Sequence, residues 1–425
     1  MHAGLDSATM RILHVSWEFP PVMYGGLGAH VVAIATEQAR AGHDVTVLTQ
    51  HGPHTADVEM IDGVRVVRAR EEGEPQERTF DNLMPWVASM QRAMNRQGRD
   101  LLGQWRPDVV HAHDWVVAAA AMTLSRASGA PLVATVHATE AGRHGGWIVG
   151  PLSQAVHRRE VRLVSAASVV IVCSRAMEDE VMAALGPFGA PVIVVPNGID
   201  LGAWQATEAE SAAARVRLGV APPAPMIVYT GRMAHEKGVG TLVDAMPAVL
   251  HELGDARLVI AGRGPQESAV RAQVTALGLD ASVTCAGFLP EHELRALVAT
   301  ANCAVVPSLY EPFGMVALEA MALGTPVVAS DVGGLAEFIT DDVTGLLVAP
   351  GDSVPLAAAV LRVLRDPELA TGLANAARSG VAAHYSWPLL AQRTVDAYQN
   401  CGPPPDARSA LERIPDMNVL TGEPA

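Results

Sequence analysis

The chain has 425 residues, a length that corresponds to two or three domains. Hydrophobic residues make up 49% and charged residues 18%, a composition typical of folded globular proteins and unlike that of disordered chains. The formal net charge of −15 argues against a protein that binds nucleic acid through its overall field, so any anionic ligand must be held by local cations.

Neither a membrane span nor a disulfide framework is expected. Apolar runs such as Val116–Leu124 are far shorter than the roughly 20 residues that cross a bilayer. Residues 1–9 are polar and do not read as a secretory signal, and Met10 looks like a second start. The absence of any C-x-x-C pair favours a reducing compartment, the cytoplasm, and the cysteines are scattered as Cys173, Cys285, Cys303 and Cys401.

Short β-branched runs alternate with Ala-rich amphipathic stretches along the first half of the chain. The runs predict strands at Ile12–Ser16, Val45–Thr49, Val64–Arg68, Asp108–His113, Leu132–His137, Val169–Cys173 and Val192–Val195. The stretches between them predict helices at Ala29–Ala41, Leu83–Gly103, Val116–Ala127, Leu152–Ala166 and Arg175–Leu185. Such alternation is typical of parallel strands with helical crossovers, so residues 1–204 are expected to form a doubly wound, Rossmann-like α/β domain.

A Glu/Ala-rich stretch that ends in a run of prolines predicts a linker at 205–225. The alternation then restarts, with strands expected at Met226–Thr230, Leu258–Ala261, Val283–Ala286, Ala304–Pro307, Pro326–Ser330 and Gly345–Val348. A second doubly wound domain is therefore expected at 226–387, followed by a helix at 388–400 and a loose tail at 401–425. Ligands bind at the carboxyl ends of such sheets, so two of them predict a cleft between the domains.

Glycines follow the first predicted strand and precede a helix. Gly25 and Gly26 would let backbone N–H groups approach an anion at the helix start. Their spacing is not the G-x-G-x-x-G of dinucleotide sites, and a tight turn without a ligand is the alternative.

Two cations lie in the loop after the first strand of the second predicted domain. Arg232 and Lys237 are five positions apart, so both can turn toward one ligand, and Lys237 is the single lysine beside 29 arginines. A guanidinium binds phosphate oxygens in pairs and an ammonium adds a point charge, which predicts a phosphate site. Two solvated loop cations are the alternative.

Two glutamates bracket the start of a later helix. Pro312 suits a first helical turn, and Gly314 leaves the backbone amides of Met315 and Val316 accessible to an anion. Glu311 precedes this helix, whereas Glu319 lies within it on an apolar segment, where an unbonded acid is costly. The two carboxylates are too far apart for one acid–base pair, but they can flank one ligand.

The first domain also carries aromatic and histidine candidates. Trp115 and Trp147 follow strand ends, and their aromatic faces suit sugar rings, with packing in the core as the alternative. His111, His113 and Asp114 form a candidate metal set, but strand alternation is expected to send neighbours to opposite faces and leave too few ligands. There is no D-x-D motif, and no metal is predicted.

Together these motifs resemble the retaining glycosyltransferases of family 4, which have the GT-B fold of two Rossmann-like domains that face a cleft. The resemblance covers about residues 10–400 and is nearest to bacterial glycogen synthases and to the mycobacterial α-1,4-glucosyltransferases of glycogen and methylglucose lipopolysaccharide synthesis. The segments Trp17–Pro21, His111–Trp115 and His137–His144 carry this narrower match. It implies retaining, metal-independent transfer of a hexose, glucose in α-1,4 linkage, from ADP-glucose or UDP-glucose to a glycan, without a cofactor.

The resemblance also implies roles for single residues. The donor diphosphate would be bound by Arg232, Lys237 and the amides of Met315 and Val316, and the ribose by Glu319. The Gly25–Gly26 loop would close against the donor phosphates or the acceptor, and Trp115 and Trp147 would be candidates to bind the acceptor. Catalytic positions at the donor sugar would be taken by Glu311, His137 beside the 6-hydroxyl, and Asp114.

Other functions are compatible with the same motifs. A mannosyltransferase or another family 4 enzyme could use a lipid or small-molecule acceptor. A nucleotide-sugar 2-epimerase shares the architecture, and a non-catalytic sugar-nucleotide-binding protein would need only the donor site. No nucleic acid partner is expected, and the oligomeric state is left open.

Overall fold

The computed structural model describes residues 9–72, 82–220 and 223–402. The chain divides into two compact units: unit 1 combines Met1–Pro196 with Trp387–Ala425, and unit 2 is Asn197–Ser386. The expected polar start and nearly all of the expected tail lie outside the described residues.

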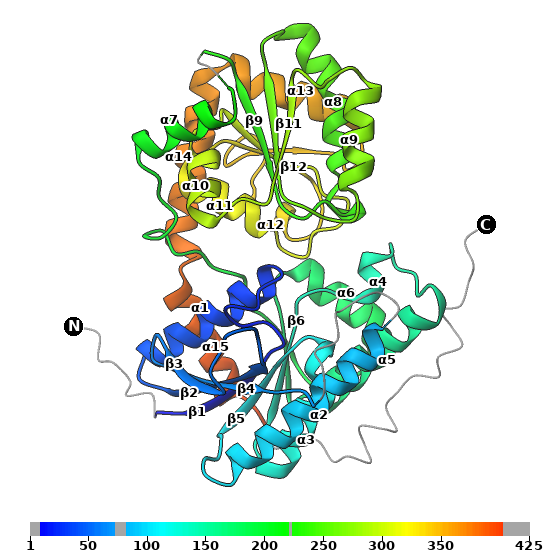
Figure 1. Ribbon diagram of the computed structural model, residues 1–425, viewed down its shortest axis with the longest axis vertical. Helices are drawn as coiled ribbons and strands as arrows, with labels where there is room; N and C mark the ends of the chain where they lie inside the picture. The colour runs from blue at the N-terminus through cyan, green and yellow to red at the C-terminus, as the bar shows by residue number, and fades with distance from the viewer. Residues whose placement is uncertain (1–8, 73–81, 221–222, 403–425) are drawn as a thin grey trace. The chain divides into compact units, whose positions relative to one another are not determined.

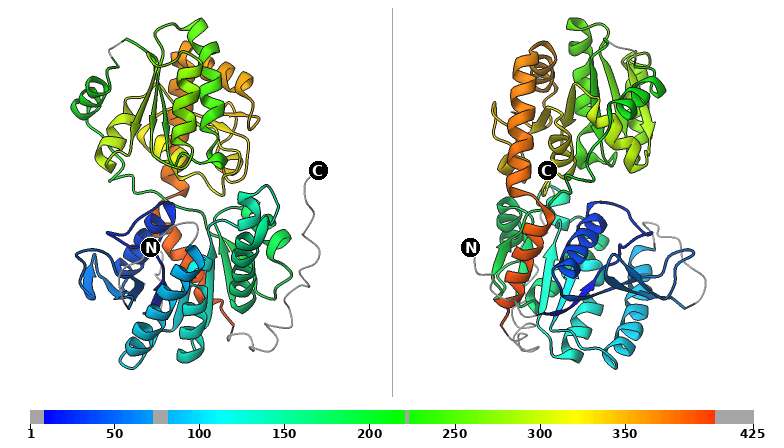
Figure 2. Two further views of the ribbon diagram at one scale, coloured as in Figure 1. Left: turned by 45° about the vertical axis from the view of Figure 1, so that its right-hand side comes forward. Right: turned by 90° about the vertical axis from the view of Figure 1, so that its left-hand side faces the viewer.

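Unit 1 contains an eight-stranded sheet in the order β3-β4-β2-β1-β5-β6-β7-β8, parallel except for β3. Helices lie on both faces of this sheet (Figures 1 and 2). The strands are β1 (Arg11–Val15), β2 (Asp44–Gln50), β3 (Val58–Ile61), β4 (Val64–Ala69), β5 (Val109–His113), β6 (Leu132–Val136), β7 (Val169–Val172) and β8 (Val192–Val194). The helices are α1 (Gly26–Arg40), α2 (Leu83–Leu102), the 3-10 helix η1 (Trp115–Val117), α3 (Ala118–Ser128), α4 (Glu140–Arg143), α5 (Gly150–Ala166), α6 (Arg175–Leu185) and α15 (Trp387–Gln399).

Unit 2 contains a six-stranded parallel sheet in the order β11-β10-β9-β12-β13-β14, again with helices on both faces (Figure 1). The strands are β9 (Met226–Thr230), β10 (Arg257–Ala261), β11 (Val283–Gly287), β12 (Cys303–Val306), β13 (Val327–Ser330) and β14 (Leu346–Val348). The helices are α7 (Glu208–Arg217), η2 (His235–Lys237), α8 (Val239–Glu252), α9 (Glu267–Ala276), α10 (Glu291–Ala299), α11 (Met315–Leu323), α12 (Leu335–Phe338), α13 (Ser353–Arg365) and α14 (Pro367–His384).

The predicted strands are confirmed at their places in the chain, with ends that differ by at most one residue. Strand β3 was not predicted. It pairs antiparallel with β4 through a two-residue turn, Asp62–Gly63, in which both residues have positive φ (48° and 83°). Asp-Gly is a preferred sequence for such tight hairpin turns.

The stretch predicted as a linker at 205–225 contains a helix, so that part of the prediction is wrong. Helix α7 begins with a capping box in which the Thr207 side chain and Glu210 bond each other's backbone N–H. Arg217 of this helix forms a 3.1 Å ion pair with Glu293 on α10. The segment before it also belongs to unit 2, because the N–H of Ile199 donates to the carbonyl of Tyr385 at 2.7 Å. For this reason unit 1 ends at Pro196 rather than at 204.

Each sheet has one point where the strand order reverses direction. In unit 1 it lies between β1 and β5, and in unit 2 between β9 and β12. Loops that leave the carboxyl ends of such strand pairs diverge to opposite faces of the sheet, which opens a crevice for ligands. The candidate residues are best judged by their position relative to these two points.

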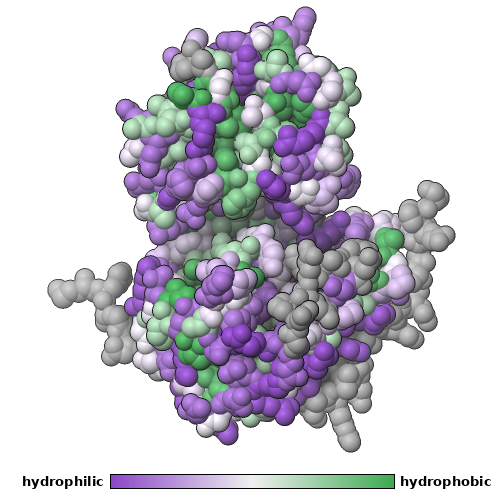
Figure 3. Space-filling model, in the orientation of Figure 1, coloured by the Kyte–Doolittle hydropathy of each residue, from purple (hydrophilic) through white to green (hydrophobic). Residues whose placement is uncertain are grey.

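Among the described residues, no helix is long and apolar enough to cross a membrane. Figure 3 shows hydrophilic residues interspersed with small hydrophobic groups over the visible face.

Candidate active site

The loop with the two predicted phosphate-binding cations leaves β9 and lies against the end of β12. Gly238 makes this approach feasible: its φ is +63°, and a Cβ there would lie 1.9 Å from the carbonyl oxygen of Pro307. The N–H groups of Leu309 and Tyr310 donate to the carbonyl of Glu236 at 2.8 and 3.1 Å. The two loops at the switch point of unit 2 are therefore fastened together.

Lys237 and Glu311 form an ion pair between these two loops. Lys237 Nζ donates to Glu311 Oε2 at 2.8 Å, and the Ser308 hydroxyl donates to the same oxygen at 3.1 Å. The side chain of Glu311 is only 9% exposed and that of Lys237 25%. Lys237 is thus not a solvated loop cation, whereas Arg232 is half exposed and paired with Glu236.

The helix after this loop begins at Met315, three residues later than Pro312. Its cap, Gly314, has φ +110°, and a Cβ there would lie 2.5 Å from Leu335 Cδ2. Because glycine offers no side chain to cap the first turn, the amides of Met315 and Val316 depend on another acceptor, as expected for an anion site.

Glu319 lies in the second turn of α11 and is only partly exposed. Burial, together with the negative charge of Glu291, raises the pKa of the Glu319 carboxyl to about 8. Among the residues that the structure describes, none forms a hydrogen bond or an ion pair with its carboxyl group. A ligand hydroxyl would supply the bond that this acid needs.

We expect Glu319→Gln to change how stability depends on pH. The pKa of this carboxyl is raised from 4.5 to about 8 in the folded state. Its favourable contribution to the free energy of unfolding is therefore complete below pH 4.5 and is lost as pH rises toward 8. The difference between the Tm of the variant and the Tm of the parent should therefore shift in favour of the variant as pH increases from 5 to 8. Thermal unfolding followed by circular dichroism at both pH values measures this, and a Tm difference independent of pH would contradict it.

The glycine loop of unit 1 already binds a carboxyl group of the protein itself. Glu18 Oε2 accepts hydrogen bonds from the N–H groups of Tyr24 at 2.8 Å and Gly25 at 3.1 Å, just before α1 begins at Gly26. Glu18 is 3% exposed. Sequence analysis missed this acid, although its place between Trp17 and Phe19 at the end of the first strand was visible.

Asp114 and His137 lie together at the carboxyl ends of β5 and β6. Asp114 Oδ1 accepts a hydrogen bond from the backbone N–H of His137 at 2.8 Å. Burial raises the pKa of Asp114 to about 6, and burial with the positive charge of nearby Arg143 lowers the pKa of His137 to about 3. His137 is therefore a neutral ring at neutral pH.

The expectation that too few metal-ligating side chains would gather around His111 and His113 is wrong. The two residues are two positions apart on β5 and so share a face, with ring centroids 4.2 Å apart. His14 joins them, and His30 and His137 join His113, in two groups whose ring nitrogens all lie within 4.8 Å. Histidine ligands are thus not scarce here, contrary to the sequence argument.

The two tryptophans proposed for the acceptor differ in exposure. Trp115 lies in η1 and is partly buried, whereas Trp147 is 44% exposed. The structure thus collects the candidates in two sets. Unit 1 holds Gly25, Gly26, Asp114, Trp115, His137 and Trp147, and unit 2 holds Arg232, Lys237, Glu311, Met315, Val316 and Glu319.

Comparisons with known proteins match both units. A family model described as Glycosyltransferase Family 4 matches residues 24–203, and one described as Glycosyl transferases group 1 matches residues 211–380. The chain is 44% identical over 401 residues to glycogen synthase of Mycobacterium tuberculosis, which covers 92% of this chain and 94% of that protein. It is 32% identical over 410 residues to α-maltose-1-phosphate synthase of Mycolicibacterium smegmatis, with 92% and 99% covered.

Among solved structures, the chain is similar to sucrose-phosphate synthase from Thermosynechococcus elongatus. The TM-score is 0.79 at 27% identity, over 92% of this chain and 98% of that one. This likeness and the two doubly wound sheets confirm the predicted fold class of two Rossmann-like α/β domains.

Proposed function

Because the chain belongs to the family 4 glycosyltransferases, with the GT-B fold and hexosyltransferase activity of that family, we propose that it elongates an α-1,4-glucan with glucose from a nucleotide diphosphate donor. The observation that carries this is the ion pair between the partly exposed Lys237 and the buried Glu311 at the switch point of unit 2. The 44% identity to a glycogen synthase supports glucose and a glucan over other sugars and acceptors.

The pair suits the charges of a glycosyl transfer. As the bond to the phosphate breaks, negative charge grows on the leaving diphosphate and positive charge on the anomeric carbon. We place the diphosphate at Lys237, Arg232 and the α11 amides, and the sugar at Glu311. Each fixed charge then faces the opposite charge that develops in the transition state.

The remaining donor contacts follow from this placement. Glu319, in the second turn of α11, is proposed to bind the ribose hydroxyls, which accounts for a carboxyl whose pKa burial raises to about 8. His137 and Asp114 are proposed to bind the sugar from unit 1, and Trp115 and Trp147 the acceptor. The proposed donors are ADP-glucose and UDP-glucose.

A labelled-donor incubation tests this function. The protein is supplied with ADP-, UDP- and GDP-linked glucose or mannose, and with maltooligosaccharide, glycogen or glucose 1-phosphate as acceptor. Label that enters the glucan, and is released as glucose by an α-1,4-specific hydrolase, supports the proposal. Label in maltose 1-phosphate alone would instead favour the activity named for the 32% identical relative. Transfer of mannose alone would contradict the proposed donor sugar.

We expect transfer to persist in excess chelator. The proposed site supplies two side-chain cations and a helix start for the charge of the leaving diphosphate, which is the task a divalent ion performs elsewhere. Initial rates with and without EDTA, after prior dialysis against chelator, measure this. A complete loss that magnesium or manganese restores would contradict it.

We also propose that the reaction takes place in the cytoplasm. All four cysteines are free thiols, and Cys173 and Cys303 are buried, as suits a reducing compartment.

A further inference from the structure

Buried histidines of unit 1 form a chain of ring-to-ring contacts that ends at His137. His14 Nδ1 lies 3.1 Å from His113 Nε2, and His113 Nδ1 lies 3.4 Å from His137 Nε2. His14 and His113 are completely buried, and burial lowers the pKa of His14 to about 4 and that of His113 well below its ordinary value. Each ring is therefore neutral, with one N–H and one lone pair.

The other end of this chain is Gln38 on α1. Its Oε1 lies 2.7 Å from His14 Nε2, and its Nε2 donates to the Tyr398 hydroxyl on α15 at 3.1 Å. The same hydroxyl lies 2.7 Å from His111 Nδ1. Gln38 thus connects two branches, and its side chain has no exposed surface.

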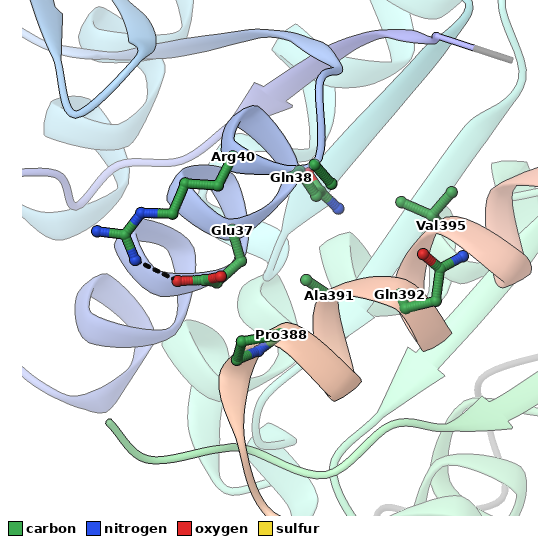
Figure 4. Close-up of a pocket in the computed structure, with 8 residues that line it drawn as sticks. Glu37, Gln38, Arg40, Pro388, Ala391, Gln392 and Val395 are labelled. Atoms are coloured by element: carbon green, nitrogen blue, oxygen red, sulfur yellow. Dashed lines mark hydrogen bonds and ion pairs between the residues drawn. The ribbon is translucent and has the colours of Figure 1, made fainter. Parts of the chain in front are cut away.

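Figure 4 shows where this residue lies. Gln38 is at the wall of a pocket of about 240 Å³ that α1 and α15 line, opposite Ala391 and Val395. Gln392 of α15 lines the same pocket but bonds Asp396 at 2.9 Å and takes no part in the chain.

The amide of Gln38 dictates every proton position along the chain. An amide oxygen only accepts, so His14 must carry its proton on Nε2 and offer Nδ1 as the acceptor. His113 then donates from Nε2 to His14, and His137 donates from Nε2 to His113. The ring of His137 is left with an unprotonated Nδ1.

The second branch agrees with this assignment. Since Gln38 Nε2 donates to the Tyr398 oxygen, the tyrosine proton is free to be donated to His111 Nδ1. His111 then carries its proton on Nε2, which lies 2.6 Å from Thr135 Oγ1. All of these buried polar groups are satisfied by one arrangement.

Gln38 is the member of this network that cannot reverse by moving a proton. A neutral imidazole can exchange tautomers and a hydroxyl can rotate, but the donor and acceptor of an amide are different atoms. Reversal would require the Gln38 side chain to turn over and break both of its hydrogen bonds.

We propose that Gln38 is a positioning residue that fixes the tautomer of His137, so that Nδ1 accepts a hydrogen bond from a hydroxyl of the donor sugar. The contact with sugar rests on the proposed function, whereas the tautomers follow from unit 1 alone. Gln38, His14 and His113 act through His137 and do not touch the substrate.

Nitrogen NMR of the unmodified protein tests the tautomers without any substrate. With ¹⁵N-histidine labelling, long-range proton–nitrogen correlations distinguish the protonated from the unprotonated ring nitrogen, and single His→Gln variants assign the signals. We expect His14, His113 and His137 to carry their protons on Nε2. Protons on Nδ1 in these three rings would overturn the proposal.

Gln38→Met tests the role of the amide, because methionine is similar in size and lacks both hydrogen-bonding groups. Gln392→Met is the matched control on the other wall of the pocket. We expect Gln38→Met to give mixed tautomers at His137 and to lower kcat about tenfold, the order of one lost hydrogen bond, with little change in donor KM. Gln392→Met should change neither. Unchanged tautomers in a folded Gln38→Met protein would overturn the proposal.

A 6-deoxyglucose donor locates the contact. In the parent protein, transfer from this donor should be about tenfold slower than transfer from the glucose donor. In Gln38→Met the difference between the two donors should largely vanish. The same penalty in both proteins would overturn the link between Gln38 and the sugar. If the parent transferred no sugar at all, the proposed function would fail, and the NMR result would still decide the tautomers.

Discussion

Glu311→Gln is expected to lower kcat by 10²-fold or more, an order of magnitude typical of single electrostatic contacts at reacting centres, with a smaller effect on donor KM. Glutamine keeps the shape of the side chain but removes the negative charge that we place beside the anomeric carbon. The variant also leaves the ammonium of Lys237 without its 2.8 Å counter-ion next to the leaving phosphate. Steady-state rates at saturating donor and acceptor measure kcat.

Two further variants show whether the effect belongs to this position. Glu252→Gln removes a carboxylate of the same unit that pairs with Arg365 at the surface, and it should leave kcat unchanged. Glu319→Ala should mainly raise donor KM, because the ribose does not react and its binding serves ground state and transition state alike. Two results together would reverse our placement of the two acids along the donor. They are a well-folded Glu311→Gln protein with the kcat of the parent, and a Glu319→Ala protein that no longer transfers the sugar.

The order of strands and helices was predictable because β-branched runs and amphipathic stretches alternate so regularly. Two elements were missed although local signals were present. The Asp62–Gly63 pair marks the hairpin of β3, and Thr207 followed three residues later by Glu210 marks the start of α7. Both signals depend on the spacing of two residues and not on the composition of the segment around them.

The positions of the candidate residues at strand ends were predictable, whereas their contacts were not. The cations and acids could be chosen because loops after parallel strands bind ligands. The ion pair between Lys237 and Glu311 joins residues 74 positions apart, and it depends on Gly238 letting one loop rest on the other. No local pattern encodes that contact.

The histidine chain shows a different limit. His111 and His113 share a face by strand periodicity, so their proximity was available from the sequence. The contributions of His14 from β1 and Gln38 from α1 require the β1–β5 pairing and the packing of α1 with α15. Networks that cross several elements therefore become visible only in the folded structure.

Acylation of Lys237 is expected to abolish glucosyl transfer, with a loss of about 10²- to 10³-fold, as for removal of a group that stabilises charge in a transition state. An amine-selective acyl reagent can modify only this side chain and the terminal amine, because Lys237 is the single lysine of the chain. The acyl group removes the positive charge and leaves the buried Glu311 carboxylate without its ion-pair partner. Mass spectrometry gives the extent of modification, and the remaining activity should fall in proportion to it.

Nucleoside diphosphate should protect Lys237 from the reagent, since both compete for the same ammonium. Lys237→Arg is the matched control: it keeps a cation at this position but has no lysine, so only its terminal amine can react. We expect the residual activity of Lys237→Arg to be insensitive to the reagent. Lys237→Met, which leaves Glu311 uncompensated, should be as inactive as the acylated parent. If the parent retained its rate after complete modification of Lys237, the diphosphate could not be bound by this side chain, and the donor would have to lie elsewhere in unit 2.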